Sequence, residues 1–373
     1  MRLHLLSLPL TVAATCNDLS IPVSARALNK ALTLNLTNLL SPSGLGNLLA
    51  TVEGLPTTLV GGEYHISARY CPPTNHVASR KDVLQVLVHG ITYTKEYWSG
   101  PVSESSSTHE SWPEYAAAQG YATLAIDRLC NGKSSHPNGL LECQVPLQGE
   151  TINEVIKQVK AGSIPNIPAH NRIIYVGHSY GSLVGDYITA THPESIDHVQ
   201  LTGFSEALVL SGAGIVVRPL YLPADVIAPL RFAGLDPTYL IGTSKEGFRP
   251  CCYIGDYDES VLDYQWERRG TFSVGEIATA LVGQVPSPSF KGDVFVLNGD
   301  EDQVFCSNHV SALAGLPGHC EEGKYHETVK AAYPNARSFA YHNIPNTGHC
   351  IMAHRTAGES VKIAHNYMAS IGF

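Results

Sequence analysis

The chain has 373 residues, of which 44% are hydrophobic and only 15% are charged, so it can bury a sizeable core and is not a disordered protein. Its 24 basic and 33 acidic residues give a net charge of −9 at pH 7, which argues against a nucleic-acid partner because phosphates bind basic surfaces. The 33 glycines and 23 prolines follow no period, which excludes collagen-like and low-complexity folds.

The first predicted element is a short apolar segment at the N-terminus. Residues Met1 to Cys16 combine a weakly basic start, an apolar run and small residues where a peptidase could cut. This pattern predicts a signal peptide over residues 1–16 and a secreted protein, with a buried strand or helix as the alternative. The glycosylation sequon at Asn35 fits secretion but does little to exclude that alternative. No later apolar run reaches the roughly 18 residues of a membrane helix, so no membrane span is expected.

The nine cysteines of the chain also bear on whether the protein is secreted. With Cys16 assigned to the cleavage site, the remaining set is even, as in a disulfide framework. The short loops between Cys130 and Cys143, and between Cys306 and Cys320, make these the first pairs to expect. Buried reduced thiols in a cytosolic enzyme are the alternative.

After a loosely patterned stretch to about Pro56, short β-rich runs alternate with runs of helical periodicity. This alternation predicts an α/β fold, with a largely parallel sheet and helices on both of its faces. Several β-rich runs are continuous in Val, Ile and Leu, as in strands buried on both faces. The predicted strands are Tyr64–Tyr70, Val83–Val88, Ala122–Ile126, Ile173–Val176, Val199–Thr202, Val294–Leu297 and Ser338–His342. The predicted helices are Glu150–Ala161, Ser182–Thr191, His326–Ala332 and Ser360–Ile371.

The stretch from Ala207 to Phe290 interrupts the alternation with prolines and aromatic residues. An insertion of this length between two core strands is more typical of a lid over a site than of a second independent domain. We therefore expect residues 17–373 to form one domain, with residues 207–290 as an inserted lid.

A strand, a sharp turn and the start of a helix are predicted over Ile173–Val184, with the pattern Gly-x-Ser-x-Gly on the turn. Ser179 would be a nucleophile there. The chemistry requires Gly177 and Gly181 because the serine takes a strained backbone conformation, and larger side chains would collide with the neighbouring strand and helix. A Gly/Ser turn without chemistry is the alternative.

Four other segments contain short motifs that accompany a serine turn of this kind in known enzymes. They are Val86–Ile91, which contains His-Gly; Ala125–Ser134, which reads Ala-Ile-Asp-Arg-Leu-Cys-Asn-Gly-Lys-Ser; Val296–Asp302, which ends Asn-Gly-Asp-Glu-Asp; and Ile344–His349, which ends Thr-Gly-His. Together with the serine turn, they resemble the α/β-hydrolase superfamily, and more closely its lid-bearing serine hydrolases, including those of filamentous fungi. The resemblance spans roughly residues 82–370. It departs from the family at Cys130, which replaces the first glycine of the Asp-Arg-x-Gly-x-Gly-x-Ser segment.

The resemblance implies a catalytic triad of Ser179, Asp302 and His349, in the chain order that this fold uses. The imidazole would take the proton of the serine hydroxyl, and the carboxylate would hold the imidazole in the correct tautomer. We prefer Asp302 to Asp300 as the acid because a Gly-x-x-Asp spacing matches the family turn, whereas Asp300 is expected to shape that turn.

The family's oxyanion hole consists of two backbone N–H groups, one after the nucleophile and one after the third strand. The matching positions are Tyr180 and Ile91, with Thr92 as a second candidate for the latter. His89 is expected to brace this loop with its ring.

A serine nucleophile excludes the dehalogenases and epoxide hydrolases of this fold, which use an aspartate. Hydrolysis of an ester, lactone or thioester of an apolar small molecule is the favoured activity, since the insertion is apolar and rich in tyrosine. Acyl transfer, carbon–carbon bond hydrolysis in secondary metabolism and a non-catalytic binding role are the alternatives. No cofactor is expected because a complete Gly-x-Gly-x-x-Gly is absent, and no metal is expected because His349, Cys350 and His354 lack a ligand pattern. The sequence does not indicate an oligomeric state.

Overall fold

The computed structural model describes residues 15–33, 51–100, 111–207, 220–307 and 316–373. Its main sheet has eight strands in the order β1-β2-β4-β3-β5-β6-β10-β11. The pairs from β4 to β11 are parallel, whereas β1 with β2 and β2 with β4 are antiparallel. The strands are β1 (Asn17–Lys30), β2 (Thr57–Cys71), β3 (Val83–Val88), β4 (Ala122–Ile126), β5 (Arg172–His178), β6 (His198–Thr202), β10 (Asp293–Gly299) and β11 (Ser338–Ile344).

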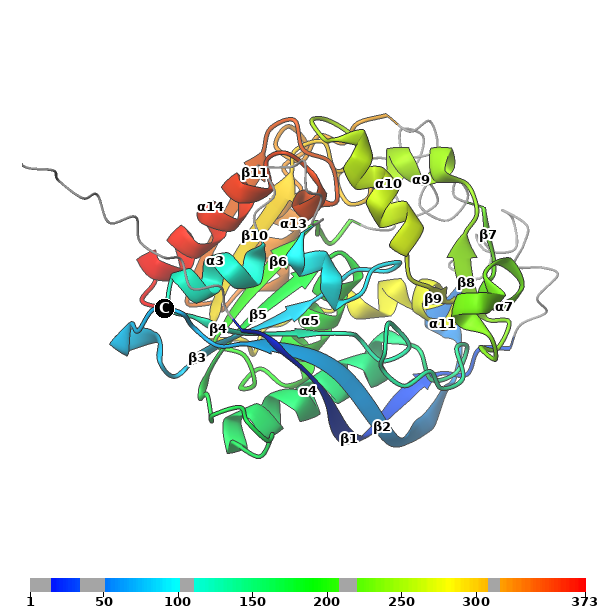
Figure 1. The fold of residues 1–373 in the computed structure, drawn as a ribbon, viewed down its shortest axis with the longest axis horizontal. Coiled ribbons are helices and arrows are strands. Elements are labelled where there is room, and N and C mark those ends of the chain that lie inside the picture. The colour runs from blue at the N-terminus through cyan, green and yellow to red at the C-terminus, as the bar shows by residue number, and fades with distance from the viewer. Residues whose placement is uncertain (1–14, 34–50, 101–110, 208–219, 308–315) are drawn as a thin grey trace, which may run out of the picture.

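Helices cover both faces of the parallel part of the sheet (Figure 1). Helices α3 and α14 lie on one side, and α4 and α5 lie on the other. The helices are α3 (Trp112–Ala118), α4 (Val145–Ala161), α5 (Tyr180–Thr191), α13 (His326–Ala332) and α14 (Ala357–Ser370). Short 3-10 helices are η1 (Val52–Gly54), η2 (Ala78–Arg80), η3 (Lys95–Ser99), η4 (Ala280–Gly283) and η5 (Ile351–Ala353). The predicted α/β fold, and every predicted strand and helix, are confirmed.

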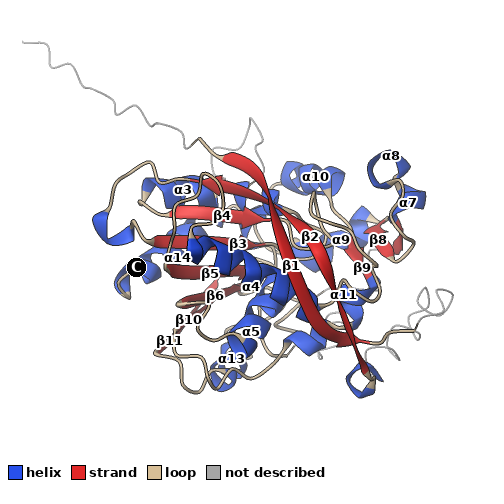
Figure 2. Ribbon diagram, turned by 90° about the horizontal axis from the view of Figure 1, so that it is seen from below, coloured by secondary structure: helices blue, strands red, loops and turns tan. Residues whose placement is uncertain are grey.

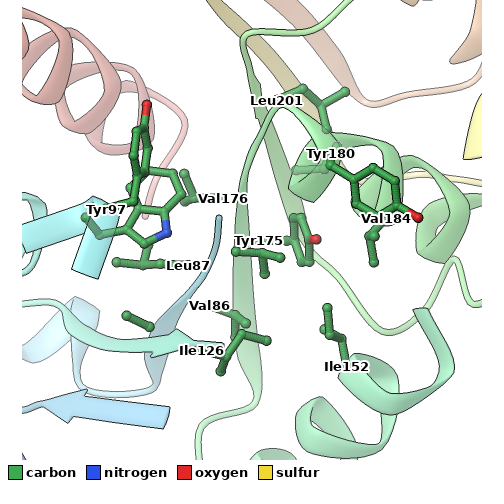
Figure 3. Packing of buried hydrophobic residues seen from close by; sticks show 14 of the residues in the cluster. Val86, Leu87, Tyr97, Ile126, Ile152, Tyr175, Val176, Tyr180, Val184 and Leu201 are labelled. Atoms are coloured by element: carbon green, nitrogen blue, oxygen red, sulfur yellow. The ribbon is translucent and has the colours of Figure 1, made fainter. Parts of the chain in front are cut away.

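The core lies between these helices and the central strands. All residues of β3 and β4 are buried, because a parallel strand with helices on both sides has no face toward water. Figure 3 shows Val86 and Leu87 of β3 beside Ile126 of β4 and Val176 of β5, all of them fully buried. The continuous Val, Ile and Leu runs in the sequence therefore mark the strands that carry the site at their carboxyl ends.

Strand β1 was not predicted, although it pairs with β2 over its whole length, from Asn17 with Tyr70 to Lys30 with Thr57. Buried residues alternate with exposed ones along β1, since it lies at the edge of the sheet and packs one face against α4 (Figure 2). An alternating strand of this kind has a weaker hydrophobic signal than the continuous central strands.

Three disulfides lie within the described residues. The bonds Cys130–Cys143 and Cys306–Cys320 confirm the two predicted pairs. The third joins Cys16 to Cys71, so the assignment of Cys16 to a discarded segment was wrong. A cut that preserves this bond must fall before Cys16. Residues 1–14 and the sequon at Asn35 lie outside the described residues.

The insertion predicted over residues 207–290 lies between β6 and β10, at the right of Figure 1. It contains a separate three-stranded sheet in the order β7-β8-β9 and several short helices. Its elements are β7 (Tyr221–Pro223), α7 (Ala224–Ile227), α8 (Pro229–Phe232), β8 (Tyr239–Gly242), α9 (Lys245–Cys252), α10 (Glu259–Arg268), β9 (Phe272–Ser273) and α11 (Val274–Ala278). Residues 208–219 lie outside the described part of the chain.

Candidate active site

Ser179 occupies the sharp turn between β5 and α5, with a φ of 54° and a ψ of −118°. A positive φ is strained for serine and is characteristic of a residue that its surroundings hold in place. A Cβ atom on Gly177 would lie 2.7 Å from the carbonyl carbon of Gly181, and one on Gly181 would collide with the carbonyl oxygen of Val88. The predicted steric reason for both glycines is therefore confirmed, and the turn presents Ser179 at the carboxyl end of the sheet.

Asp302 and His349 form a direct hydrogen bond. Nδ1 of His349 lies 2.8 Å from Oδ2 of Asp302, and both residues are buried. The other oxygen, Oδ1, accepts the backbone N–H groups of Val304 and Phe305 at 2.8 and 3.1 Å. In the neutral imidazole, a carboxylate that accepts from Nδ1–H selects the tautomer whose Nε2 is unprotonated and able to take a proton.

The loops that carry these two residues pack directly against each other. A Cβ atom on Gly299 would collide with the carbonyl oxygens of Thr347 and Gly348, just before His349. The glycine of the Gly-x-x-Asp spacing is thus required by close backbone approach. Asp300 points elsewhere, because its Oδ1 accepts the N–H of Glu321 at 2.8 Å.

Ser179 and His349 each lie against a glycine, and His178 lies near both glycines. A Cβ atom on Gly90 would lie 2.9 Å from Cβ of Ser179, and one on Gly203 would lie 2.9 Å from Cε1 of His349. The ring of His178 lies near both positions, at 3.3 and 3.0 Å, and its centroid is 4.9 Å from that of His349. The three predicted triad residues therefore all lie at the carboxyl end of the sheet, in the loops that follow β5, β10 and β11.

The two predicted oxyanion-hole donors belong to the segments that adjoin the serine, the start of α5 and the loop after β3. The carbonyl of Ser179 accepts the N–H groups of Ser182 and Leu183 at 2.8 and 3.2 Å, so Tyr180 is in the first turn of α5, where an N–H has no intrahelical partner. Ile91 follows Gly90, which lies against Ser179. The alternative, Thr92, has a φ of 64°.

His89 braces the loop after β3, as predicted. Its Nε2 accepts the N–H of Arg128 at 3.1 Å, so Nδ1 carries the proton and donates to the carbonyl of Gly90 at 2.7 Å. Burial, with a further contribution from the charge of Arg128, lowers the pKa of His89 well below its ordinary value. The ring is therefore neutral, as this pair of hydrogen bonds requires.

His178 has a closer relation to the site than the sequence indicated. Its ring stacks on Tyr97 with centroids 4.4 Å apart, and its Nδ1 lies 3.2 Å from the hydroxyl of Thr202. Because that hydroxyl donates to the carbonyl of Gly177, Nδ1 of His178 must be the donor to it. Burial and the neighbouring His349 lower the pKa of His178 well below its ordinary value. The ring of His178 is therefore an uncharged neighbour of His349.

Cys130, the departure from the family pattern, has a φ of 74°. Glycine adopts this left-handed conformation without strain, which explains the family's preference at this position. In this chain the disulfide to Cys143 anchors the residue instead. Two positions later, a Cβ atom on Gly132 would collide with the carboxylate of Asp127, which receives Lys95 as a buried ion pair at 2.8 Å.

The insertion contacts two of the loops that form the site. Gly255 forms a β-bridge with Thr347, and the N–H of Asp256 donates to the carbonyl of Asn346 at 2.8 Å. The N–H of Gly270 donates to the carbonyl of Thr92 at 2.7 Å. The insertion is therefore joined to the loop before His349 and to the loop after β3. These contacts are between backbone atoms, so they do not depend on particular side chains and could not be predicted from residue types.

Among the residues that the structure describes, no group of three or more His, Cys, Asp or Glu side chains could hold a metal ion. None of the helices in the described ranges is both long and apolar enough to cross a membrane.

Comparisons with known proteins agree with this architecture. The model of the alpha/beta hydrolase family matches residues 85–359. An esterase from Thermogutta terrifontis superposes with a TM-score of 0.51 at 14% identity, covering 84% of this chain and 96% of its own. An α/β-hydrolase fold protein from Chitinophaga pinensis superposes with a TM-score of 0.50 at 14% identity, covering 82% of this chain and 94% of its own. No curated protein sequence matches significantly. Because the family model covers most of the chain, this protein belongs to the alpha/beta hydrolase family.

Proposed function

We propose that the protein is a serine esterase that cleaves an ester of an apolar small molecule through an acyl-enzyme. The observation that carries this proposal is the 2.8 Å contact between Asp302 and His349, at the edge of the sheet where Ser179 occupies its strained turn. Lactones and thioesters fall within the same chemistry, since each has an electrophilic acyl carbon and a leaving group that accepts a proton.

In the proposed reaction, Oγ of Ser179 attacks the acyl carbon while Nε2 of His349 takes the hydroxyl proton. The N–H groups of Tyr180 and Ile91 bind the oxyanion of the tetrahedral intermediate. The imidazolium then gives its proton to the leaving alcohol, and the acyl group stays on Ser179. A water molecule, deprotonated by His349, attacks the acyl-enzyme. As the acid leaves, the imidazolium returns that proton to Oγ and regenerates the serine.

A series of p-nitrophenyl esters of increasing acyl length tests this proposal. The folded protein is expected to release p-nitrophenol, with a dependence of kcat/KM on chain length that measures the acyl pocket. A folded protein that hydrolyses no member of the series and no thioester or lactone would contradict it.

We propose further that the insertion is a lid over this site. Its α9 and α10 form an aromatic layer in which the rings of Phe248 and Trp266 lie 5.7 Å apart, and those of Phe248 and Tyr253 lie 6.1 Å apart. Tyr253 in turn stacks near His354, five residues after His349, at 6.2 Å. The layer therefore packs against the segment that follows His349, which supports the proposal that the insertion covers this part of the site.

Replacing Trp266 by alanine is expected to change the ratio of kcat/KM between short and long acyl groups by roughly tenfold. Removing apolar groups from a pocket alters selectivity by about this amount. Leu230→Ala is the matched control, since Leu230 on α8 of the same insertion is fully exposed. A large fall in melting temperature with an unchanged substrate ranking would show that Trp266 is only part of the packing.

We also propose that the protein is secreted, and the three disulfides support this because such bonds persist in oxidising compartments. Under denaturing conditions, the six cysteines of these bonds are expected to resist alkylation until a reductant is added. Intact-mass analysis is also expected to place the mature N-terminus just before Cys16. A chain in which every cysteine alkylates without reductant, or one that begins after Cys16, would contradict the proposal.

A further inference from the structure

Arg128 is fully buried beneath the candidate site. Burial of a charge is costly unless it is paired and hydrogen-bonded on all sides. Its Nη1 donates to the carboxylate of Glu276 and to Oε1 of Gln148, the latter at 2.5 Å. Its Nε and Nη2 donate to the carbonyls of His89 and Gly90 at 2.9 and 3.2 Å. Half of the guanidinium therefore binds a counter-charge, and the other half binds the loop after β3.

The contact with Gly90 concerns the proposed oxyanion hole directly. The carbonyl of Gly90 and the N–H of Ile91 belong to one planar peptide unit, so whatever fixes the carbonyl also fixes the direction of the N–H. That carbonyl receives two donors, Nδ1 of His89 and Nη2 of Arg128. Donors at a carbonyl also polarise the N–H of the same unit and strengthen it as a hydrogen-bond donor.

The same guanidinium contacts the second donor residue. Its Cζ lies 4.6 Å from the centroid of the Tyr180 ring, a cation–π geometry. Arg128 therefore contacts both the peptide unit that carries the N–H of Ile91 and the side chain of Tyr180. We propose that Arg128 is a positioning residue that orients the oxyanion hole; this inference rests on the proposed esterase function.

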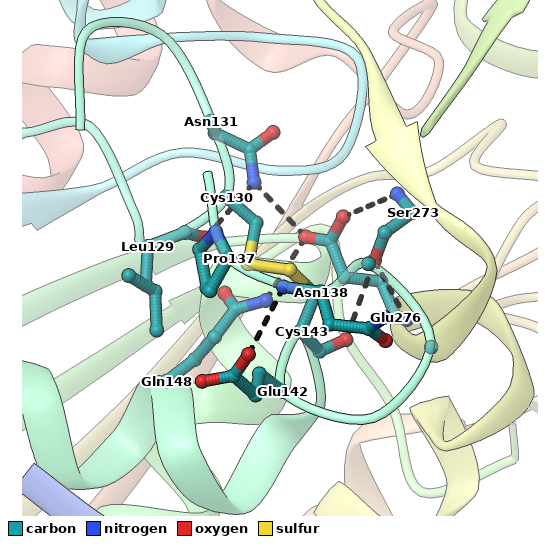
Figure 4. The surroundings of a disulfide bond; sticks show 12 residues. Leu129, Cys130, Asn131, Pro137, Asn138, Glu142, Cys143, Gln148, Ser273 and Glu276 are labelled. Carbon is teal, nitrogen blue, oxygen red and sulfur yellow. Dashed lines mark hydrogen bonds between the residues drawn. A yellow bond between two sulfur atoms is a disulfide. The ribbon is translucent and has the colours of Figure 1, made fainter. Parts of the chain in front are cut away.

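Glu276, the partner of Arg128, comes from α11 of the insertion. It is fully buried, and its Oε1 also receives Nδ2 of Asn131 and Nε2 of Gln148, each at 3.1 Å. Its Oε2 accepts the N–H of Ser273 at 2.7 Å, which closes a capping box at the start of α11. Figure 4 shows this carboxylate beside the Cys130–Cys143 disulfide. Besides its backbone contact with Thr92, the insertion thus supplies the carboxylate that pairs with the guanidinium bound to the carbonyl of Gly90.

A purely structural ion pair and a positioning residue differ in what their loss changes. Arg128 does not touch the substrate in this proposal, so its loss should leave substrate binding nearly unchanged. It should weaken the tetrahedral state, because preorganised donors act on the charge that develops there. A trifluoromethyl ketone reports on this state, since Ser179 adds to its carbonyl and the resulting oxyanion occupies the same hole.

The experiment uses three variants. Two are the single substitutions Arg128→Lys and Glu276→Gln. The third is a double variant that combines Arg128→Met and Glu276→Gln and so removes both charges together. The control is Arg337→Met with Asp293→Asn, an ion pair at the opposite end of β10. For each variant, kcat and KM are measured on a p-nitrophenyl ester together with Ki for the ketone. The Arg128 and double variants are expected to lower kcat about 10- to 100-fold with KM changed by less than about threefold. Ki is expected to rise in proportion to the loss of kcat/KM, and the control is expected to keep wild-type values.

A folded double variant with wild-type kcat and Ki would overturn the inference and leave the proposed function intact. A lower melting temperature with an unchanged Ki would also overturn it, since only a structural role remains. If the double variant fails to fold, Arg128→Lys decides by the same criteria. A wild-type protein that neither hydrolyses esters nor binds the ketone would defeat the proposed function and, with it, the inference.

Discussion

Replacing Ser179 by alanine is expected to abolish ester hydrolysis and leave the fold intact. The substitution deletes the proposed nucleophile but removes only one oxygen atom, so it creates no sizeable cavity. Loss of a triad member typically lowers kcat by about 10⁴- to 10⁶-fold. The measurement is kcat on a p-nitrophenyl ester that the wild-type protein cleaves, with circular dichroism to establish that both proteins are folded.

A matched control for this variant is Ser360→Ala on α14. Ser360 is also buried, and its hydroxyl donates to the carbonyl of Thr356 at 3.0 Å, a bond that involves none of the three proposed catalytic residues. The control is expected to lose about 1 kcal/mol of stability, the usual net value of such a bond, and to retain its kcat. Near wild-type turnover in folded Ser179→Ala protein would show that the serine mechanism is wrong.

The second large effect is expected for Asp302→Asn, which should lower kcat by about 10⁴-fold. The amide oxygen can still accept the N–H groups of Val304 and Phe305, so the loop should keep its shape. The amide nitrogen would then face Nδ1 of His349 and donate to it. This moves the imidazole proton to Nε2, where it blocks the acceptance of the serine proton.

Asp300→Asn is the paired variant for this prediction. Its amide oxygen can keep the hydrogen bond from the N–H of Glu321, and its position does not bring it to His349. We therefore expect a change in kcat of less than about tenfold, because the imidazole retains its carboxylate. If Asp300→Asn were the more damaging of the two in equally folded protein, the acid would have to be reassigned to Asp300.

The central strands could be predicted from the sequence because burial on both faces leaves continuous runs of apolar residues. The same reasoning failed for β1, where only one face is buried and small residues such as Ala25 and Ala27 provide the apolar positions. The strands of the insertion are as short as Phe272–Ser273, so no hydrophobic period can develop in them. Length and composition therefore indicated an insertion but not its internal sheet.

The site was accessible to sequence reasoning where close backbone approach dictates the residue type, as at Gly177, Gly181 and Gly299. The pairing of Arg128 with Glu276 was not accessible, because the partners lie 148 positions apart and each is an ordinary charged residue in its local sequence. The bond from Cys16 to Cys71 was missed for a different reason: the apolar N-terminal pattern placed Cys16 in the segment predicted to be removed.

The central claim is that Ser179 is the nucleophile. The most direct test is to react the folded protein with a fluorophosphonate and locate the adduct by peptide mass spectrometry. We predict one equivalent of covalent adduct on the peptide that contains Ser179, formed in step with the loss of ester hydrolysis. An adduct on a different residue, or full hydrolytic activity after complete labelling, would contradict the claim.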